Sequence, residues 1–127
     1  MPEEKYNVYF DEQKNMVVMK WYGYCTSGEF RDGTELMLET LIKNKASKVL
    51  ADIREMDLIG QEDQHWLENN FLPRAITAGF KKIAIVQPQS YFNKVAVECI
   101  SRKINKEQLT LEFRENIEEA VGWLMNG

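Results

Sequence analysis

A cysteine and an arginine lie at a spacing that some phosphatases use, in the segment Cys25-Thr26-Ser27-Gly28-Glu29-Phe30-Arg31. In such loops a thiolate at a helix start attacks phosphorus while the arginine binds the phosphate oxygens. Here Glu29 would place a negative charge inside a loop meant for a dianion, and Asp32 stands where a hydroxyl would assist the leaving thiolate. Because spacing alone is weak evidence, a Cys25/Arg31 phosphatase is the least favoured of three hypotheses for this chain.

Polar side chains follow three expected strands, in the loops 22–27, 54–61 and 87–93. Ligands of open sheets gather beyond the carboxyl ends of parallel strands, so we expect these loops to meet at one rim. Arg54 could hold a carboxylate or a phosphate there with two hydrogen bonds. The ordinary alternative, which we favour, is that Arg54 pairs with a neighbouring carboxylate and that the other polar residues cap helices. The remaining candidate binding residues of these loops are Asp57, Ser90, Tyr91 and Asn93.

The segment after position 60 holds the one histidine and two large aromatic residues that could serve a site. His65 can titrate near neutrality, but it has no evident nucleophile beside it, and we expect an exposed helix residue. Trp66 and Phe71 could line a pocket for an apolar ligand, although aromatic residues at this spacing mostly fill a core. Arg102, Lys103 and Lys106 make a local positive spot without interleaved aromatic residues.

Composition restricts the class of protein and of ligand. The 127 residues are 44% hydrophobic and 28% charged, as in a soluble globular chain, and are expected to form a single domain over residues 1–127. The net charge of −4 disfavours nucleic acid as a partner. The longest apolar runs are too short to insert into a membrane. Two cysteines and one histidine give no familiar metal motif, so we expect neither a metal nor a cofactor. A polar start and free thiols favour the cytoplasm.

The hydrophobic pattern predicts an α/β fold whose elements would position these residues. Alternating and β-branched runs predict strands at 6–10, 16–22, 49–53, 82–86 and 109–113. Helical spacing predicts helices from about 27 to 43, at 61–78, at 91–104 and at 117–125, with Cys99 on an apolar helix face and Pro73 bending or interrupting the second helix. This order calls for an N-terminal hairpin followed by parallel βα units, in a mixed sheet of four to five strands flanked by about four helices.

Several segments are similar to the SpoIIAA-like branch of the STAS domains, also labelled STAS/SEC14. They are Trp21-Tyr22-Gly23, Glu29-Phe30-Arg31, Val49-Leu50-Ala51-Asp52-Ile53-Arg54, Glu62-Asp63-Gln64-His65-Trp66-Leu67 and Ile83-Ala84-Ile85-Val86. The resemblance implies a STAS-like sheet flanked by helices. The better-understood relatives are non-enzymatic switches that bind a partner kinase or an anti-sigma factor and accept phosphate on a serine at a helix start. Other relatives are discussed as binders of nucleotides or lipids.

The corresponding helix start departs from the switch pattern, because residues 57–63 contain neither serine nor threonine. Glu62 and Asp63 could imitate a phosphorylated start, but acidic residues in a first turn usually complement the helix dipole. Our leading hypothesis is a non-catalytic STAS-like regulatory or protein-interaction domain, whose protein partner contacts the exposed start of this helix. The proposed contact residues are Gln61, Glu62, Asp63 and His65.

The second hypothesis is a small-molecule site for a lipid or a nucleotide between that helix and the sheet. Trp66 and Phe71 would form its walls, and Arg54 would hold the charged end of the ligand. A continuous apolar cavity beside Trp66 and Phe71 would favour this hypothesis, whereas a filled core and an exposed apolar patch would favour a protein partner. A homodimer is compatible with either hypothesis.

Overall fold

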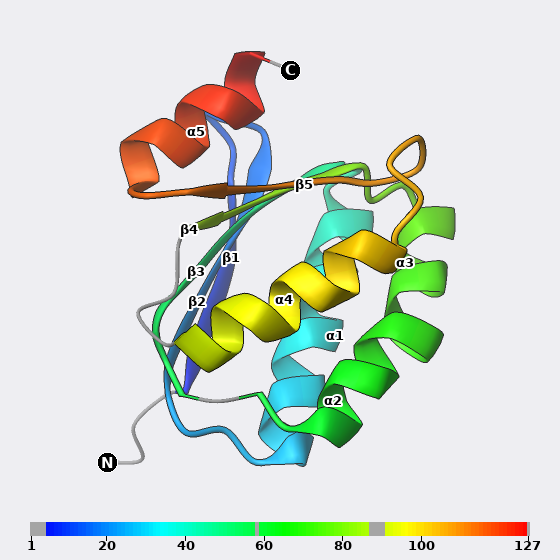
Figure 1. Ribbon diagram of the computed structural model, residues 1–127. Helices are drawn as coiled ribbons and strands as arrows, with labels where there is room; N and C mark the ends of the chain where they lie inside the picture. Colours follow the sequence, from blue (N-terminus) through cyan, green and yellow to red (C-terminus); the bar gives the residue numbers. More distant parts are fainter. Residues whose placement is uncertain (1–4, 58, 87–90, 127) are drawn as a thin grey trace.

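The computed structural model describes residues 5–57, 59–86 and 91–126, and within them an N-terminal pair of strands is followed by alternating helical segments and strands (Figure 1). The strands are β1 (Tyr6–Asp11), β2 (Met16–Gly23), β3 (Lys48–Met56), β4 (Lys82–Val86) and β5 (Thr110–Arg114). The helices are α1 (Ser27–Lys43), α2 (Gln61–Trp66), the π-helical segment η1 (Leu67–Phe71), α3 (Leu72–Thr77), α4 (Tyr91–Lys103) and α5 (Ile117–Asn126).

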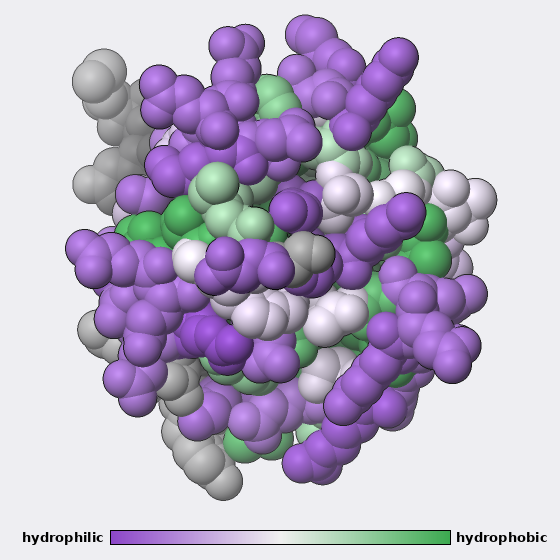
Figure 2. Space-filling model, turned by 90° about the horizontal axis from the view of Figure 1, so that it is seen from above, coloured by the Kyte–Doolittle hydropathy of each residue, from purple (hydrophilic) through white to green (hydrophobic). Residues whose placement is uncertain are grey.

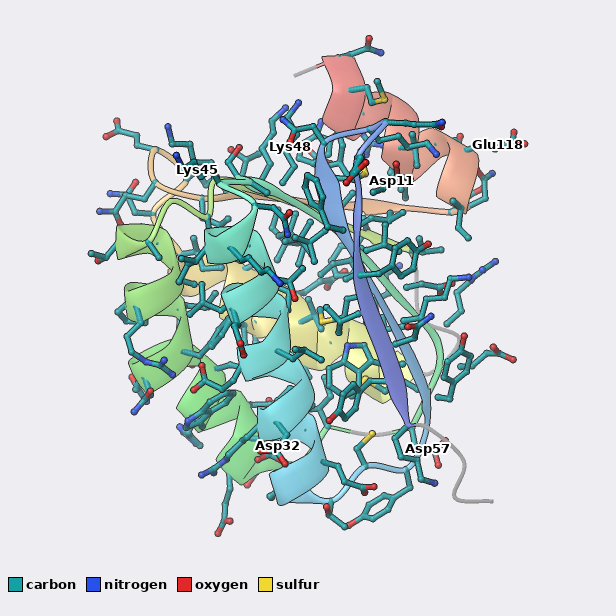
Figure 3. All side chains as sticks on the ribbon, turned by 180° about the vertical axis from the view of Figure 1, so that it is seen from behind. Asp11, Asp32, Lys45, Lys48, Asp57 and Glu118 are labelled. Atoms are coloured by element: carbon teal, nitrogen blue, oxygen red, sulfur yellow. The ribbon has the colours of Figure 1, made fainter. Side chains whose placement is uncertain are left out.

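The described strands form one mixed sheet in the order β1-β2-β3-β4-β5. A hairpin joins β1 and β2 in antiparallel pairing, and the pairs β2–β3, β3–β4 and β4–β5 are all parallel. The parallel strands therefore end at the same edge of the sheet. Figure 3 shows this direction, since Lys48 lies at the start of β3 and Asp57, just beyond its end, lies at the opposite end of the sheet.

Each strand sends alternate side chains into two unequal cores, because successive residues of a strand point to opposite faces. The larger core lies between the sheet and the layer formed by α1, α2, η1, α3 and α4, and it takes Val49, Ala51 and Ile53 from β3. The smaller core lies under α5 and takes Leu50 from β3 together with Ala120 and Leu124 from α5. Figure 1 shows α5 on the opposite side of the sheet from α1, α3 and α4.

Helix α1 begins at a capping box and approaches the sheet closely. The hydroxyl of Thr26 accepts a hydrogen bond from the Glu29 backbone N–H at 3.2 Å, and the Glu29 carboxylate accepts one from the Thr26 N–H at 2.9 Å. Two backbone donors of the first turn are thus satisfied. Gly33 faces the sheet, and a Cβ placed there would lie 2.5 Å from the Trp21 ring and 2.9 Å from the Tyr6 ring. A glycine at this position lets the helix pack against these aromatic rings.

The second helical segment contains a π-helical turn immediately before Pro73. The Leu72 N–H donates to the carbonyl of Leu67, five residues earlier, which is the π-helical pattern. Proline has no N–H, and in an α-helix its ring would clash with the carbonyl four residues earlier. The wider turn relieves that clash, and the helix continues as α3 to Thr77. Gly79 follows the C-cap residue Ala78, and its φ of +113° suits glycine.

These elements confirm the predicted α/β class, the mixed sheet and the flanking helices, and all predicted strands and helices are present. Pro73 interrupts the second helix as expected, in the form of a π turn rather than a break. The expectation for Cys99 was wrong, because this residue is exposed on α4. It lies one position before Ile100, which is the buried residue at this point of the helix.

We expect Gly33→Ala to lower the free energy of unfolding by about 1–3 kcal/mol, the usual cost of overpacking. Gly122→Ala on α5 is the matched control, because a Cβ there meets no atom within 4 Å. It should instead raise the free energy of unfolding by about 0.5–1 kcal/mol through helix propensity. Urea unfolding of both variants checks this pair. Equal effects of the two substitutions would contradict the close approach of α1 to Trp21 and Tyr6.

Candidate functional site

The loops after β2 and β3 meet at one rim of the sheet. The Asp57 backbone N–H donates to the Gly23 carbonyl at 2.8 Å, and this bond joins the end of β2 to the loop that leads into α2. Parallel β4 ends at the same edge, with Val86 level with Asp52. Two of the three predicted loops therefore lie together. The prediction for Ser90 falls outside the described residues, and Tyr91 and Asn93 belong to the first turn of α4.

Asp63 anchors the start of α2 to the start of α1. Its side chain is only 8% exposed, and its carboxylate accepts hydrogen bonds from the Ser27 hydroxyl at 3.1 Å and from Arg31 Nε at 3.3 Å. The prediction that Asp63 forms part of an exposed contact surface was therefore wrong. A buried carboxylate needs such partners, and the first turn of α2 places it toward α1.

The neighbours of Asp63 remain on the surface. Gln61, Glu62 and His65 are exposed, and they lie on the side of α2 that faces away from α1. Asp57, which is also exposed, is the residue directly after β3. Figure 2 views the opposite end of the molecule, where α5 lies, and that end is covered mainly by hydrophilic residues, with hydrophobic residues only in small separate patches. The α5 end thus offers no broad apolar surface to a protein partner.

Arg54 is engaged by Asp52 on the face of the sheet opposite the larger core. Its Nε and a terminal nitrogen donate to the two carboxylate oxygens of Asp52 at 3.0 and 2.8 Å. Between them in the chain, Ile53 points into the larger core, so Asp52 points to the opposite face, and its hydrogen bonds hold the Arg54 guanidinium there. The ordinary alternative for Arg54 is thus confirmed. The expectation that Arg54 holds the charged end of a ligand lying beside α2 was wrong, because the sheet stands between them.

This ion pair changes the titration of Asp52. Burial alone would raise the pKa of its carboxyl group, but the hydrogen bonds and the charge of Arg54, with a smaller effect of Lys20, lower the pKa below its usual value. The same pairing raises the pKa of Arg54. Asp52 is therefore ionised in the folded protein at neutral pH, and it holds Arg54 in place.

The Cys25 and Arg31 side chains are not arranged for attack on a phosphate. Burial and the nearby charge of Glu29 raise the pKa of the Cys25 thiol, whereas a nucleophilic cysteine needs a lowered one. Arg31 pairs with Asp63 and lies over the Trp66 ring, with its Cζ 5.3 Å from the ring centroid. Its guanidinium thus stabilises the junction of α1 and α2.

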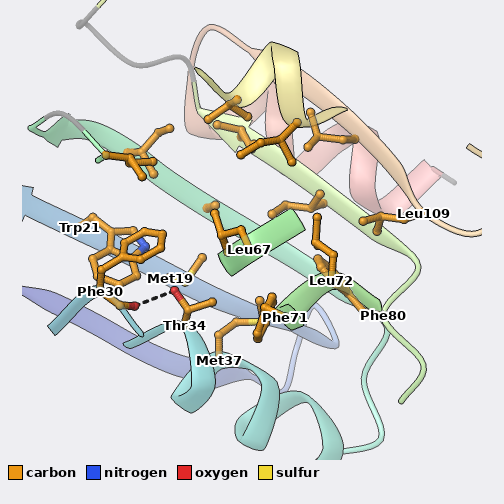
Figure 4. Close-up of a pocket in the computed structure, with 18 of the residues that line it drawn as sticks. Met19, Trp21, Phe30, Thr34, Met37, Leu67, Phe71, Leu72, Phe80 and Leu109 are labelled. Carbon is orange, nitrogen blue, oxygen red and sulfur yellow. Dashed lines mark hydrogen bonds between the residues drawn. The ribbon is translucent and has the colours of Figure 1, made fainter. Parts of the chain in front are cut away.

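An apolar cavity of about 110 Å³ lies inside the larger core, between the sheet and the layer of α1, η1, α3 and α4 (Figure 4). Among its lining residues in the described chain, Thr34 and Trp21 carry side-chain hydrogen-bond donors, a hydroxyl and an indole N–H, and the Thr34 hydroxyl donates to the Phe30 carbonyl at 2.7 Å. No buried side-chain nitrogen or oxygen atom of the described residues is left without a hydrogen-bond partner. Residues of the wall that Figure 4 labels include Met19, Trp21, Met37, Leu67, Phe71, Leu72, Phe80 and Leu109.

The aromatic residues predicted as walls take different positions. Phe71 lines the cavity, as expected, whereas Trp66 stands behind it and is not part of the wall. The Trp66 ring lies 5.5 Å from the ring of Phe71 and 6.4 Å from that of Phe30, between centroids. The π turn accounts for the first contact, because residues five apart come to one side of a wider helix. Trp66 thus supports the cavity wall from outside.

A surface groove of about 360 Å³ lies between α3 and α4 and adjoins the cavity. Leu72, Ile100 and Ile104 line both spaces, so these three side chains form the partition between them. Across the groove Lys103 of α4 pairs with Glu68 of η1 at 3.0 Å. The sequence indicated Lys103 only as part of a positive spot. The sequence pattern did not predict that Lys103 lies opposite Glu68, because the π turn sets the direction of Glu68.

Comparison with solved structures identifies the fold. The chain is similar to an uncharacterised protein of the DUF3478 family with a SpoIIAA-like fold from Shewanella loihica PV-4, with a TM-score of 0.69 and 18% sequence identity. The match covers 98% of this chain and 97% of that chain. No protein-family model and no curated protein matches the sequence. The chain therefore has a SpoIIAA-like fold, as its sequence resemblance implied.

Two further properties concern the described residues only. No helix among them has the length and apolar character needed to cross a membrane. Within the same residues, no three side chains of histidine, cysteine, aspartate or glutamate gather as they would around a metal ion.

The lowered pKa of Asp52 predicts a pH-dependent contribution to stability. Because the folded-state pKa lies below the unfolded value of about 3.8, this contribution is complete above that value and is lost as pH falls through the folded-state pKa. Wild type should therefore be more stable than Asp52→Asn at neutral pH, and the difference should shrink in acid. Urea unfolding of both proteins from neutral pH to about pH 2 measures it. A difference that stays constant over this range would contradict the role of the Asp52 charge.

Proposed function

We propose that this protein is a non-catalytic binding domain for a small apolar molecule, or for the apolar part of an amphiphile, held in the cavity beneath Phe71. The observation that carries this proposal is the apolar cavity itself, which lies within the larger core. Protein interiors rarely leave spaces larger than a water molecule. An apolar space of this kind stays dry and takes apolar ligands, as an engineered cavity of about 150 Å³ does with benzene or xenon.

The position of the cavity supports ligand entry. Leu72, Ile100 and Ile104 separate it from the groove between α3 and α4, and side chains of this kind can change rotamer. Met19 and Met37 line the cavity as well, and methionine adapts to ligands of different shape. The π-helical turn supplies Leu67 and Phe71 to the same wall. Such turns are frequent at functional sites.

The chemistry of the polar residues supports a role without catalysis. Cys25 carries a thiol whose pKa is raised, and Arg31 is held by Asp63 and Trp66. His65 is exposed on α2, away from the cavity wall. A reaction inside the cavity would need a polar group to act on the ligand. Thr34 and Trp21 are the wall residues with side-chain hydrogen-bond donors; the Thr34 hydroxyl is committed to the Phe30 carbonyl, and the Trp21 indole N–H can only donate a hydrogen bond.

Filling the cavity should abolish ligand binding. Val97 lines the cavity from α4, and we expect Val97→Phe to occupy the space and to remove the xenon-dependent chemical shifts of the wall methyl groups in NMR spectra. Val95→Phe is the matched control, because Val95 lies on the same helix and is 38% exposed. Its xenon response should equal that of wild type.

A variant that fills less of the cavity keeps the test informative if Val97→Phe does not fold. Ala51→Val adds less volume to the cavity wall from β3 and should weaken the xenon response in part. Titration with 1-octanol, followed by the same spectra, extends the test to a flexible chain. If wild type shows no saturable response to xenon or octanol, or if Val97→Phe responds as wild type does, the proposed cavity function is wrong.

A protein partner at the start of α2 is the second candidate function. The supporting observation is that Gln61, Glu62 and His65 are exposed on a turn that Asp63 anchors rigidly to α1. Such a surface presents a fixed pattern of charge and hydrogen-bonding groups to a regulatory partner. Asp63 itself belongs to the anchor, so it would orient the surface and would not contact the partner.

Charge reversal at this surface tests the second candidate. We expect Glu62→Lys to remove a specific partner recovered by affinity capture from the source organism, because like charges would replace complementary ones at the contact. Glu118→Lys on α5 is the control, since Figure 3 places Glu118 at the opposite end of the molecule from Asp57. Recovery of the same proteins with wild type and Glu62→Lys would rule out this surface.

A further inference from the structure

We propose that the ligand of the cavity is a single-chain amphiphile with a carboxylate end, and that Lys103 binds this carboxylate in the groove between α3 and α4. This inference rests on the proposed function and deepens it, since it names the chemical class of the ligand and the end at which it enters. The cavity would take the end of the alkyl chain, and the groove would take the rest of the chain and its charged end.

The two adjoining spaces have the polarity of such a molecule. The inner cavity is lined almost entirely by apolar side chains. The groove adds polar and charged side chains to its apolar floor, among them Glu68, Lys103, Asn105 and Gln108. Because Leu72, Ile100 and Ile104 belong to both linings, a chain that displaces them runs directly from the polar groove into the apolar cavity.

The charge around the groove favours an anion over a cation. Lys103 is the one cationic residue that lines it in the described chain, and exposed Arg102 and Lys106 lie close to it in sequence. These three positive charges outnumber the two nearby carboxylates, Glu68 of the groove lining and exposed Glu107, in a protein whose net charge is −4. The Oδ1 of Asn105 accepts from the Glu107 backbone N–H at 2.9 Å, so this side chain has its amide N–H groups to offer to a carboxylate.

The ion pair between Lys103 and Glu68 can break easily to admit a ligand. The Lys103 side chain is 62% exposed and that of Glu68 is 23% exposed, so water screens their attraction. Exposed ion pairs of this kind contribute little to stability. A ligand carboxylate can therefore replace Glu68 as the partner of Lys103 at small cost. The closed pair spans the groove in the unliganded protein, and the exchange of partners opens it.

Three probes with the same eight-carbon alkyl chain but different end groups show how the end group affects binding. Octanoate, 1-octanol and octylamine are titrated into the full-length protein at neutral pH, and their dissociation constants are measured by NMR. We expect octanoate to bind wild type about tenfold more tightly than octanol, since a hydrogen bond to a charged group has about that effect. Octylamine, which would meet Lys103 with like charge, should bind more weakly than octanol.

Three variants test whether Lys103 causes the preference for octanoate over octanol. Lys103→Gln should lose the tenfold advantage of octanoate and leave octanol unchanged, whereas Lys106→Gln, which removes a nearby charge outside the groove lining, should keep most of it. Glu68→Gln should tighten octanoate binding, because it removes the competing carboxylate. Both lysine positions are exposed, so these proteins are expected to fold as wild type does.

The outcomes distinguish this inference from the function on which it rests. If octanol binds wild type and Val97→Phe blocks it, but octanoate has no advantage or octylamine binds best, the carboxylate inference is wrong and the cavity function stands. If none of the three probes binds wild type, the cavity function itself fails. An octanoate advantage that persists in Lys103→Gln would also overturn the assignment to Lys103.

Discussion

The structure depends on the burial of apolar side chains on both faces of one sheet, with unequal cover on the two faces. Side chains of α1, of the α2–α3 segment and of α4 pack on one face of the sheet, whereas α5 covers part of the other face. The alternation of β3 as far as Ile53 then decides the environment of Asp52, and the shifted register beyond it turns Met56 rather than Glu55 into the larger core. Ile53 enters the larger core, and Asp52 and Arg54 are left to each other on the opposite face. The sheet thereby separates its charged pair from its cavity.

The same constraint explains where a ligand could lie. Helices that pack on a twisted sheet fill the space between them only where side-chain lengths match. Along β3 the inward residues include Ala51, whose short side chain leaves room beneath η1 and α4. The wide π turn adds Phe71 and Leu67 to the roof of this space, while Trp66 is turned outward against Phe30. The cavity is thus a product of small residues on the sheet and of irregular helix geometry above it.

Sequence patterns predicted most of the fold because hydrophobic periodicity is a local signal. The hairpin and the parallel βα units could both be inferred from it. The site was harder to predict, because local sequence patterns do not show which side chains from distant segments come into contact. The local pattern predicts an exposed first-turn acid at Asp63, whereas in the fold Ser27 and Arg31 donate hydrogen bonds to its carboxylate. Likewise, nothing near Lys103 in sequence indicates Glu68, which lies far back in the chain.

The π-helical turn before Pro73 also affects how relatives should be compared. Such a turn holds one residue more than the α-helical turn it replaces, so it corresponds to a single inserted residue in the chain. Relatives with a plain α-helix at this point would align with a one-residue gap between positions 67 and 71. Without the extra residue, every side chain upstream would be rotated about the helix axis by roughly 100° relative to α3. Loss or gain of one amino acid could therefore reshape the roof of the cavity while the rest of the fold stays the same.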